Sequence, residues 1–296
     1  MSPNLGILGS VYSRALAKGG YVLGGNQTTT INKIAFSADT ITTLATTLSV
    51  GNQQQAGFSN NGVAGYAAGG STAGGNVASI EKISLLTETR SVLAATLSAV
   101  EAEVSGASNN ASAGYVFGGN PLVATIDKIT FPADTKSTLA ATLTTARRST
   151  ASSSNQGTAA YVAGGYDTTY IAGIDKIAYA ADTKTTLGAT LATARLRASG
   201  FANSGTAGYV AGGYNAGTLS SINKITYSGD TISTVTATLS VARDGGTAFS
   251  NGNTAGYIVD GGNTSTDKIA FSADTITTLA AVLSYTPSYP AGFANA

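Results

Sequence analysis

The chain contains 296 residues, of which 43% are hydrophobic and 10% are charged, and its formal net charge is +1. This near-neutral balance lacks the clustered basic charge that attracts nucleic acid or an anionic membrane surface. The sequence has neither cysteine nor histidine, which excludes disulfides, thiolate metal sites and the commonest general base of enzymes. We therefore expect no cofactor, no metal site and no catalytic residues.

The N-terminal segment, MSPNLGILGSVYSRALAKGG, lacks the basic stretch followed by an apolar core that a signal peptide requires. No stretch of the chain reaches the roughly 18 consecutive apolar residues of a membrane span. These features predict a protein made in the cytoplasm, without membrane insertion. Residues 1–16 include the apolar sequence LGILGSVY. We expect them to form an arm that docks on another subunit, or alternatively a linker or an extra strand beside the first repeat.

Two motifs then alternate along the chain. A tyrosine shortly before a Gly-Gly pair occurs six times, at Tyr21, Tyr66, Tyr115, Tyr161, Tyr209 and Tyr257. A motif of the type IDKI follows each, with its lysine at Lys33, Lys82, Lys128, Lys176, Lys224 and Lys268. Each of the first five lysines lies 33 residues before the next of these tyrosines, whereas the distance from tyrosine to lysine varies from 11 to 16. Because packed strands cannot change length without losing register and surface loops can, each repeat has one free loop after Gly-Gly.

Each repeat reads as four short strands separated by turn residues. In the fifth repeat the predicted strands are ASGFAN, GYVAGG, INKITYS and STVTATLS, with NSGTA and SGDT as turns between them. Four-stranded units of about 45–50 residues are typical of β-propeller blades. The sequence therefore predicts an all-β propeller with one blade per repeat.

The end of the chain explains how the propeller closes. The final residues, AGFANA, match the first strand of the fifth repeat, and the other three strands of this last unit stand near Tyr21. We therefore expect residues 290–296, approximately, to complete blade one, so that residues 17–296 form a closed ring of six blades. Closure removes an open sheet edge. The alternative is a linear β-solenoid, which would leave this strand without a partner and need capping units.

The repeat, with Tyr and Gly-Gly followed by a strand, a turn and L..A..R, resembles the kelch repeat over residues 17–296. The kelch tryptophan is absent, so the resemblance is to a divergent, kelch-like propeller. The last position of L..A..R is occupied by Arg147, Arg195 and Arg243 in three repeats and by Asn52, Glu101 and Pro287 in the others.

The motifs TIDKI, L..AR and SN.T.G also resemble the Gly-rich propeller repeats of virion and tail-fibre proteins of tailed phages, notably those of cyanobacteria. This resemblance implies a non-enzymatic virion protein, with other virion proteins as partners, in part through residues 1–16, or with further copies of itself in a homo-oligomer.

The free loops are the candidate binding sites, since all six should emerge on one face of the propeller. The loops of repeats four and five contain YDTTYIAG and YNAGTLSS. We expect the rings of Tyr166, Tyr170 and Tyr214 to act as flat platforms for sugars, with Asp167 and Asn215 bonding sugar hydroxyls. The alternative is that these tyrosines only cover neighbouring blades.

The repeat lysines permit two interpretations. They form either a basic ring that attracts sulfated or phosphorylated glycans, or local pairs with the acids that lie six residues further on, across one hairpin turn, unless both groups are simply solvated. We favour the local pairs. These acids are Asp39, Glu88, Asp134, Asp182, Asp230 and Asp274.

Three roles follow from these features. The first is a tail- or fibre-associated virion protein that recognises a glycan or protein of the host surface. The second is a capsid decoration or structural adaptor protein of the virion, and the third is a cellular kelch-like interaction module or lectin. An enzyme is disfavoured, because most carboxylates belong to the repeat itself and no pair of them stands out as acid and base. A lyase or hydrolase built from Tyr, Arg and Glu is the remaining enzymatic alternative.

Overall fold

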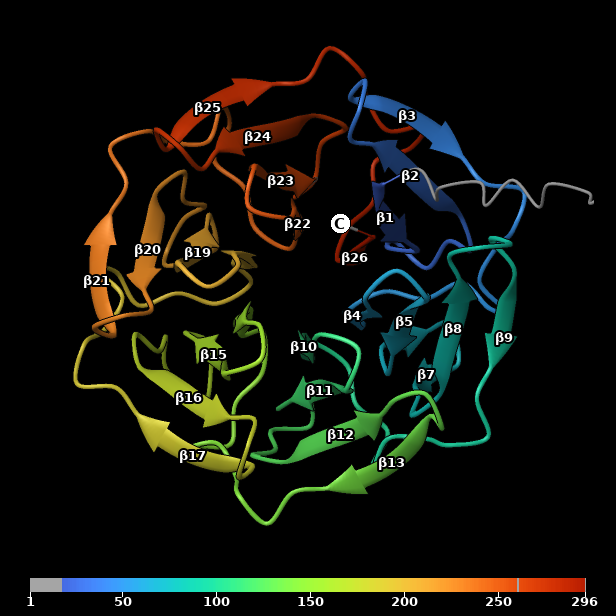
Figure 1. Ribbon diagram of the computed structural model, residues 1–296, viewed down its shortest axis with the longest axis horizontal. Helices are drawn as coiled ribbons and strands as arrows, with labels where there is room; N and C mark the ends of the chain where they lie inside the picture. Colours follow the sequence, from blue (N-terminus) through green and yellow to red (C-terminus); the bar gives the residue numbers. More distant parts are fainter. Residues whose placement is uncertain (1–17, 260, 296) are drawn as a thin grey trace, which may run out of the picture.

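In the computed structural model the described residues, 18–259 and 261–295, form a ring of six four-stranded antiparallel sheets around a central axis (Figure 1). The predicted six-bladed β-propeller is confirmed. No helix in the described part of the chain has the length and apolar character needed to cross a membrane. The predicted N-terminal arm, residues 1–16, lies outside the described residues.

Blade one contains, from the axis outward, β26 (Ala291–Asn295), β1 (Gly19–Leu23), β2 (Ile31–Ala35) and β3 (Thr40–Thr43). The other blades follow in chain order. Blade two contains β4 (Ala56–Asn60), β5 (Ala64–Ala68), β8 (Ile80–Ser84) and β9 (Arg90–Val92), and blade three contains β10 (Ser105–Asn109), β11 (Ala113–Phe117), β12 (Ile126–Thr130) and β13 (Thr135–Thr138). Blade four contains β14 (Ala151–Asn155), β15 (Ala159–Ala163), β16 (Ile174–Ala178) and β17 (Thr183–Thr186), and blade five contains β18 (Ser199–Asn203), β19 (Ala207–Ala211), β20 (Ile222–Thr226) and β21 (Thr231–Thr234). Blade six contains β22 (Thr247–Asn251), β23 (Ala255–Val259), β24 (Thr266–Ala270) and β25 (Thr275–Thr278). A small hairpin, β6 (Ser71–Thr72) and β7 (Gly75–Asn76), decorates blade two.

The ring closes through the C-terminal strand, as predicted. β26 pairs antiparallel with β1, with Tyr21 opposite Phe293. The two rings stack with centroids 5.1 Å apart, and the equivalent rings of blade five, Phe201 and Tyr209, stack at the same distance. The sheet that joins the two ends of the chain is therefore built like the sheets formed by continuous chain.

The strand order defines two faces of the disc. Tight turns join the first strand to the second and the third strand to the fourth, and we call the face that carries them the turn face. The variable loops and the connections to the next blade lie at the other ends of the strands, on what we call the loop face. The prediction that all variable loops share one face is thus confirmed by the common strand order of the six sheets.

The second strand of every blade is completely buried, because a neighbouring blade covers each side of its sheet. Close packing between blades depends on glycine. A Cβ atom on Gly65 of blade two would lie 1.9 Å from the Phe293 ring of blade one. The same contact joins Phe58 to Gly114 in the next blade. An inner-strand phenylalanine therefore packs on a glycine of the following blade.

Two blades replace this phenylalanine with a small residue, and a tyrosine of the following blade occupies the space. Ser153 stands at the phenylalanine position of blade four, and the hydroxyl of Tyr227 in blade five donates to its Oγ at 3.3 Å. Ala107 stands there in blade three, and the Tyr179 hydroxyl of blade four reaches the carbonyl of Ser108 at 3.2 Å. The core between blades thus keeps its volume although the repeat sequence changes.

The fourth strand was predicted wrongly. In blade five the prediction was STVTATLS, residues 233–240, whereas β21 covers Thr231–Thr234. The chain then leaves the sheet and packs under the variable loop, where the amides of Leu239 and Arg243 donate to the carbonyls of Ser220 and Leu219. Leu239 is buried there, so the apolar residues of this segment serve the connection to the next blade.

Candidate functional site

The three tyrosines predicted from the variable loops lie together on the loop face. The rings of Tyr166 and Tyr170 meet edge to face, with centroids 5.8 Å apart, and Tyr170 lies 6.1 Å from Tyr214 of the next blade. Each side chain is partly exposed. None of the three hydroxyls has a hydrogen-bond partner among the described residues. We call these residues the tyrosine cluster, which spans blades four and five.

An arginine borders the tyrosine cluster. The Arg148 guanidinium lies 5.4 Å from the Tyr166 ring centroid. The backbone amide of each residue also donates a hydrogen bond to the carbonyl of the other, at 3.0 and 3.1 Å. Arg148 also forms an ion pair with Glu103 of the preceding blade. Arg148 thus supports one side of the tyrosine cluster, and Glu103 balances its positive charge.

The two polar residues predicted to bond a sugar have local roles in the structure. The Asp167 carboxylate accepts hydrogen bonds from the backbone amides of Thr168 and Thr169, and these bonds lower its pKa. The Asn215 amide donates to the carbonyl of Ala194 at 2.7 Å. Both side chains therefore shape the loops that carry the tyrosines. Their contact with a sugar stays a prediction.

A ring of left-handed residues surrounds the axis on the loop face. One residue per blade has a positive φ, between 54 and 67°, just before the inner strand. Within the described chain, five of these residues donate their amide to the carbonyl of the equivalent residue in the preceding blade, at 2.7–2.9 Å. The ring, which we call the channel mouth, consists of Gln54, Glu103, Ser149, Arg197, Gly245 and Tyr289.

Side chains narrow the channel mouth. The Tyr289 ring lies against Gly245, where a Cβ atom would meet it at 2.3 Å, and the Arg197 guanidinium lies 4.9 Å from the ring centroid. The pKa of Tyr289 is raised, mainly because its side chain is partly buried. Variation in repeat length does not reveal this mouth. Its signal in the sequence is variation in residue type, since this one position of the repeat carries six different residue types.

The repeat lysines pair between blades, so the prediction of local pairs across one hairpin turn is wrong. Lys82 of blade two donates to Asp134 of blade three at 2.6 Å, and Tyr66 donates to the other oxygen of the same carboxylate at 2.7 Å. All six acids have a left-handed backbone, with φ between 50 and 54°, and their side chains point toward the preceding blade. The remaining groups are Tyr21 and Lys33 with Glu88, Tyr115 and Lys128 with Asp182, Tyr161 and Lys176 with Asp230, Tyr209 and Lys224 with Asp274, and Tyr257 and Lys268 with Asp39.

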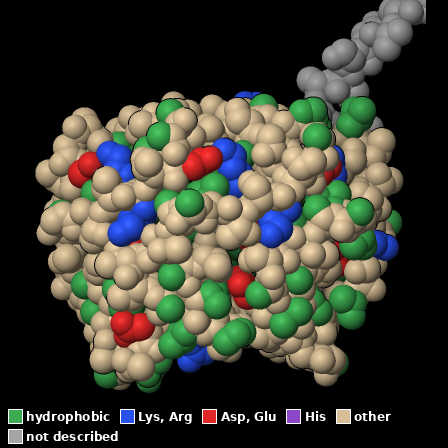
Figure 2. All heavy atoms as spheres, turned by 90° about the horizontal axis from the view of Figure 1, so that it is seen from below, with side chains coloured by type: hydrophobic (Ala, Val, Ile, Leu, Met, Phe, Trp, Pro, Cys, Tyr) green, Lys and Arg blue, Asp and Glu red, His purple; other side chains and the backbone are tan. Residues whose placement is uncertain are grey.

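This pairing explains the electrostatics of the disc. Burial, and then the bond to the acid, raises the pKa of Tyr66, so its hydroxyl remains a donor. In Figure 2 several positive side chains lie next to negative ones, in a mostly uncharged surface. Because each repeat lysine has an acidic partner, the basic ring considered for sulfated or phosphorylated glycans is neutralised.

The last position of L..A..R lies inside the molecule. The Arg147 guanidinium bonds Asp175 at 3.1 Å, with both side chains at most 2% exposed, and Arg243 bonds Asp267 at the same distance. In blade three Glu101 replaces the arginine beside Asp127. Burial, followed by the charge of Asp127, raises the pKa of Glu101 to about 7. Arg147 and Arg243 thus tie their connections to the blades that they enter, which is a structural role.

No model of a known protein family matches this chain. A search of curated proteins found no match either.

Proposed function

We propose that this propeller is a tail- or fibre-associated protein of a phage virion that binds saccharides of the host surface through the tyrosine cluster. The observation that carries the proposal is the arrangement of Tyr166, Tyr170 and Tyr214, three partly exposed rings from two blades in edge and tilted contact. Aromatic faces suit the apolar faces of sugar rings, and rigid tyrosines lose little conformational entropy on binding. Their hydroxyls supply hydrogen bonds at the rim of the site.

The scaffold supports this use. Ion pairs and buried tyrosines join every blade to the next, so the loops of blades four and five stand on a rigid frame. A site of this kind binds weakly when alone. Many copies on one particle convert weak binding into firm attachment, because each later contact forms at a high effective concentration.

A structural adaptor or decoration protein of the virion is the second candidate, and exposed apolar residues of blade two favour it. Leu86 is 71% exposed and Val63 is 54% exposed. A backbone bond of 3.0 Å from Leu85 to Val63 holds the two turns side by side. Leu86 and Val63 thus form an exposed apolar pair on the turn face, and such a surface is the kind that another protein covers.

An adsorption assay separates the two candidates. The purified chain, multivalently displayed on beads, should bind host cells, and Tyr170→Ala should reduce that binding at least tenfold. Leu86→Ser is the matched control on the other face and should leave it unchanged. Unchanged adsorption of Tyr170→Ala would contradict recognition by the tyrosine cluster, and no adsorption by the purified wild-type chain would favour the adaptor. Absence of the chain from purified particles, tested by mass spectrometry, would contradict both.

A further inference from the structure

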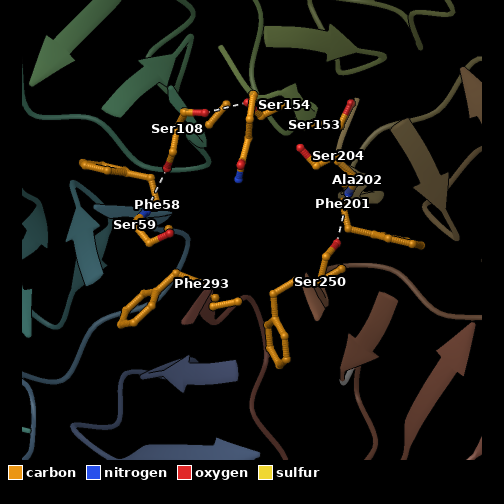
Figure 3. Close-up of a pocket in the computed structure, with 18 of the residues that line it drawn as sticks. Phe58, Ser59, Ser108, Ser153, Ser154, Phe201, Ala202, Ser204, Ser250 and Phe293 are labelled. Carbon is orange, nitrogen blue, oxygen red and sulfur yellow. Dashed lines mark hydrogen bonds between the residues drawn. The ribbon is translucent and has the colours of Figure 1, made fainter. Parts of the chain in front are cut away.

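A cavity with a volume of about 400 Å³ lies on the propeller axis and opens toward the turn face (Figure 3). The inner strands of the six blades form its wall, together with Lys18 and the turns that follow the inner strands of blades two, four, five and six. In Figure 3 the side chains of Phe58, Phe201 and Phe293 point away from the axis, between the blades, so they leave the centre open. The volume falls in the range of small-molecule sites, roughly 300–1,000 Å³.

The wall of this axial cavity combines polar and apolar groups and is almost uncharged. Among the residues that line it, serine, asparagine and glutamine supply the side-chain hydrogen-bonding groups, and Lys18 supplies the one charge. Five of these side chains have no hydrogen-bond partner among the described residues, which leaves hydroxyls and amides available to a ligand. They are Ser59, Asn61, Gln156, Ser204 and Asn253.

The cavity is narrow at its other end. A Cβ atom on Gly57 would lie 2.1 Å from the carbonyl oxygen of Gly292, and one on Gly200 would lie 2.2 Å from that of Ser152. The backbones of adjacent inner strands therefore touch at this level. Above it the channel holds only about 100 Å³, and Tyr289 lies at its mouth. The cavity is therefore accessible from the turn face and bounded by the level of these glycines.

We propose that the axial cavity binds a neutral saccharide end. Hydroxyl and amide groups each offer donors or acceptors, and a sugar hydroxyl uses both. A charged ligand would lose its hydration here without gaining an opposite charge in return, apart from Lys18 at the wall. The site shares no residue with the tyrosine cluster and lies on the opposite face, so it does not depend on the function proposed above.

Backbone amide spectra of the ¹⁵N-labelled full chain test this site. Glucose, galactose, rhamnose and N-acetylglucosamine are titrated in turn, with glucuronate and glucosamine as charged comparisons. We expect at least one neutral sugar to shift the amides of Ser59 and Ala202, whether or not it also shifts the amide of Tyr170. Each charged sugar should bind at least tenfold more weakly. The proposal is overturned if no neutral sugar shifts the cavity amides, or if a charged sugar binds more tightly than all neutral ones.

Two variants locate the binding within the cavity. Ala202→Ile places a larger side chain on a cavity-facing position and should abolish the shifts, and Ser59→Ala removes a free hydroxyl and should weaken binding about threefold or more. Tyr170→Ala should leave cavity binding unchanged. If Ala202→Ile does not fold, as judged from its melting curve, Ser59→Ala decides. Full affinity in Ser59→Ala and in any folded Ala202→Ile would overturn the assignment, whatever the outcome at the tyrosine cluster.

Discussion

The hydroxyl of Tyr66 in blade two donates a hydrogen bond of 2.7 Å to Asp134 in blade three. Lys82, directly opposite Tyr66 in the same sheet, donates to the other oxygen of that carboxylate. One carboxylate thus receives both groups of a cross-strand pair from the neighbouring blade. The arrangement recurs at all six blade boundaries of the described propeller.

Replacing the carboxylate of Asp134 should weaken the boundary between blades two and three. We expect Asp134→Ala to lower the free energy of unfolding by about 2–3 kcal/mol, because the buried hydroxyl of Tyr66 and the partly exposed Lys82 both lose a charged acceptor. Asp134→Asn keeps an acceptor for Tyr66 and loses the ion pair with the partly exposed Lys82, so it should cost roughly 1 kcal/mol. Urea unfolding measures both. Thr87→Ala, in an exposed part of the neighbouring turn, is the control and should change stability by less than about 0.5 kcal/mol. Equal stability of all three variants would show that the boundary does not depend on this carboxylate.

Glu101 makes the stability of blade three depend on pH. Its pKa is raised in the fold from 4.5 to about 7, so its stabilising effect is complete below about 4.5 and is lost as the pH rises through 7. We therefore expect Glu101→Gln to stabilise the protein by roughly 1–3 kcal/mol at pH 8 and to change little at pH 4.5. Glu101→Arg should do the same by forming with Asp127 the pair that Arg147 forms with Asp175. Urea unfolding at both pH values decides, and a parallel pH dependence in wild type and Glu101→Gln would exclude Glu101 as the cause.

Tyr227 and Ser153 should behave as a coupled pair. Tyr227→Leu alone leaves a space beside Ser153 and should cost about 2–4 kcal/mol. Adding Ser153→Phe recreates the combination of Phe293 with Leu85 found between blades one and two, and Gly208 provides the glycine on which such a phenylalanine packs. We expect the double variant to recover at least 1 kcal/mol relative to Tyr227→Leu. Additive losses in the double-mutant cycle would show that the two positions are independent.

The repeat made most of the architecture predictable. The constant spacing from lysine to tyrosine gave the number of blades and located the free loops, since only a packed frame holds length so strictly. The match between residues at Phe293 and Phe201 gave the closing strand. The tyrosines of two adjacent loops were therefore expected on one face, and the structure shows Tyr170 in contact with both Tyr166 and Tyr214.

Other features needed three-dimensional contacts. Lys33 and Asp39 occur six residues apart, but Lys33 pairs with Glu88 of blade two and Asp39 pairs with Lys268 of blade six. Distance along the sequence does not show toward which blade the side chain of such an acid points. The fourth strand was misplaced because threonine-rich sequence suits both a strand and the connection after it. The cavity was missed because its wall consists of small residues that appear only as ordinary strand positions.

Closure of the ring is the claim on which the loop face and the axial cavity both depend, and hydrogen exchange tests it most directly. The peptide that covers 291–295 is compared with the peptide that covers 199–203, which has a nearly identical sequence and lies within continuous chain. We predict similar protection of the two segments, with exchange over hours under native conditions. Exchange of 291–295 within seconds, while 199–203 stays protected, would contradict the closed propeller.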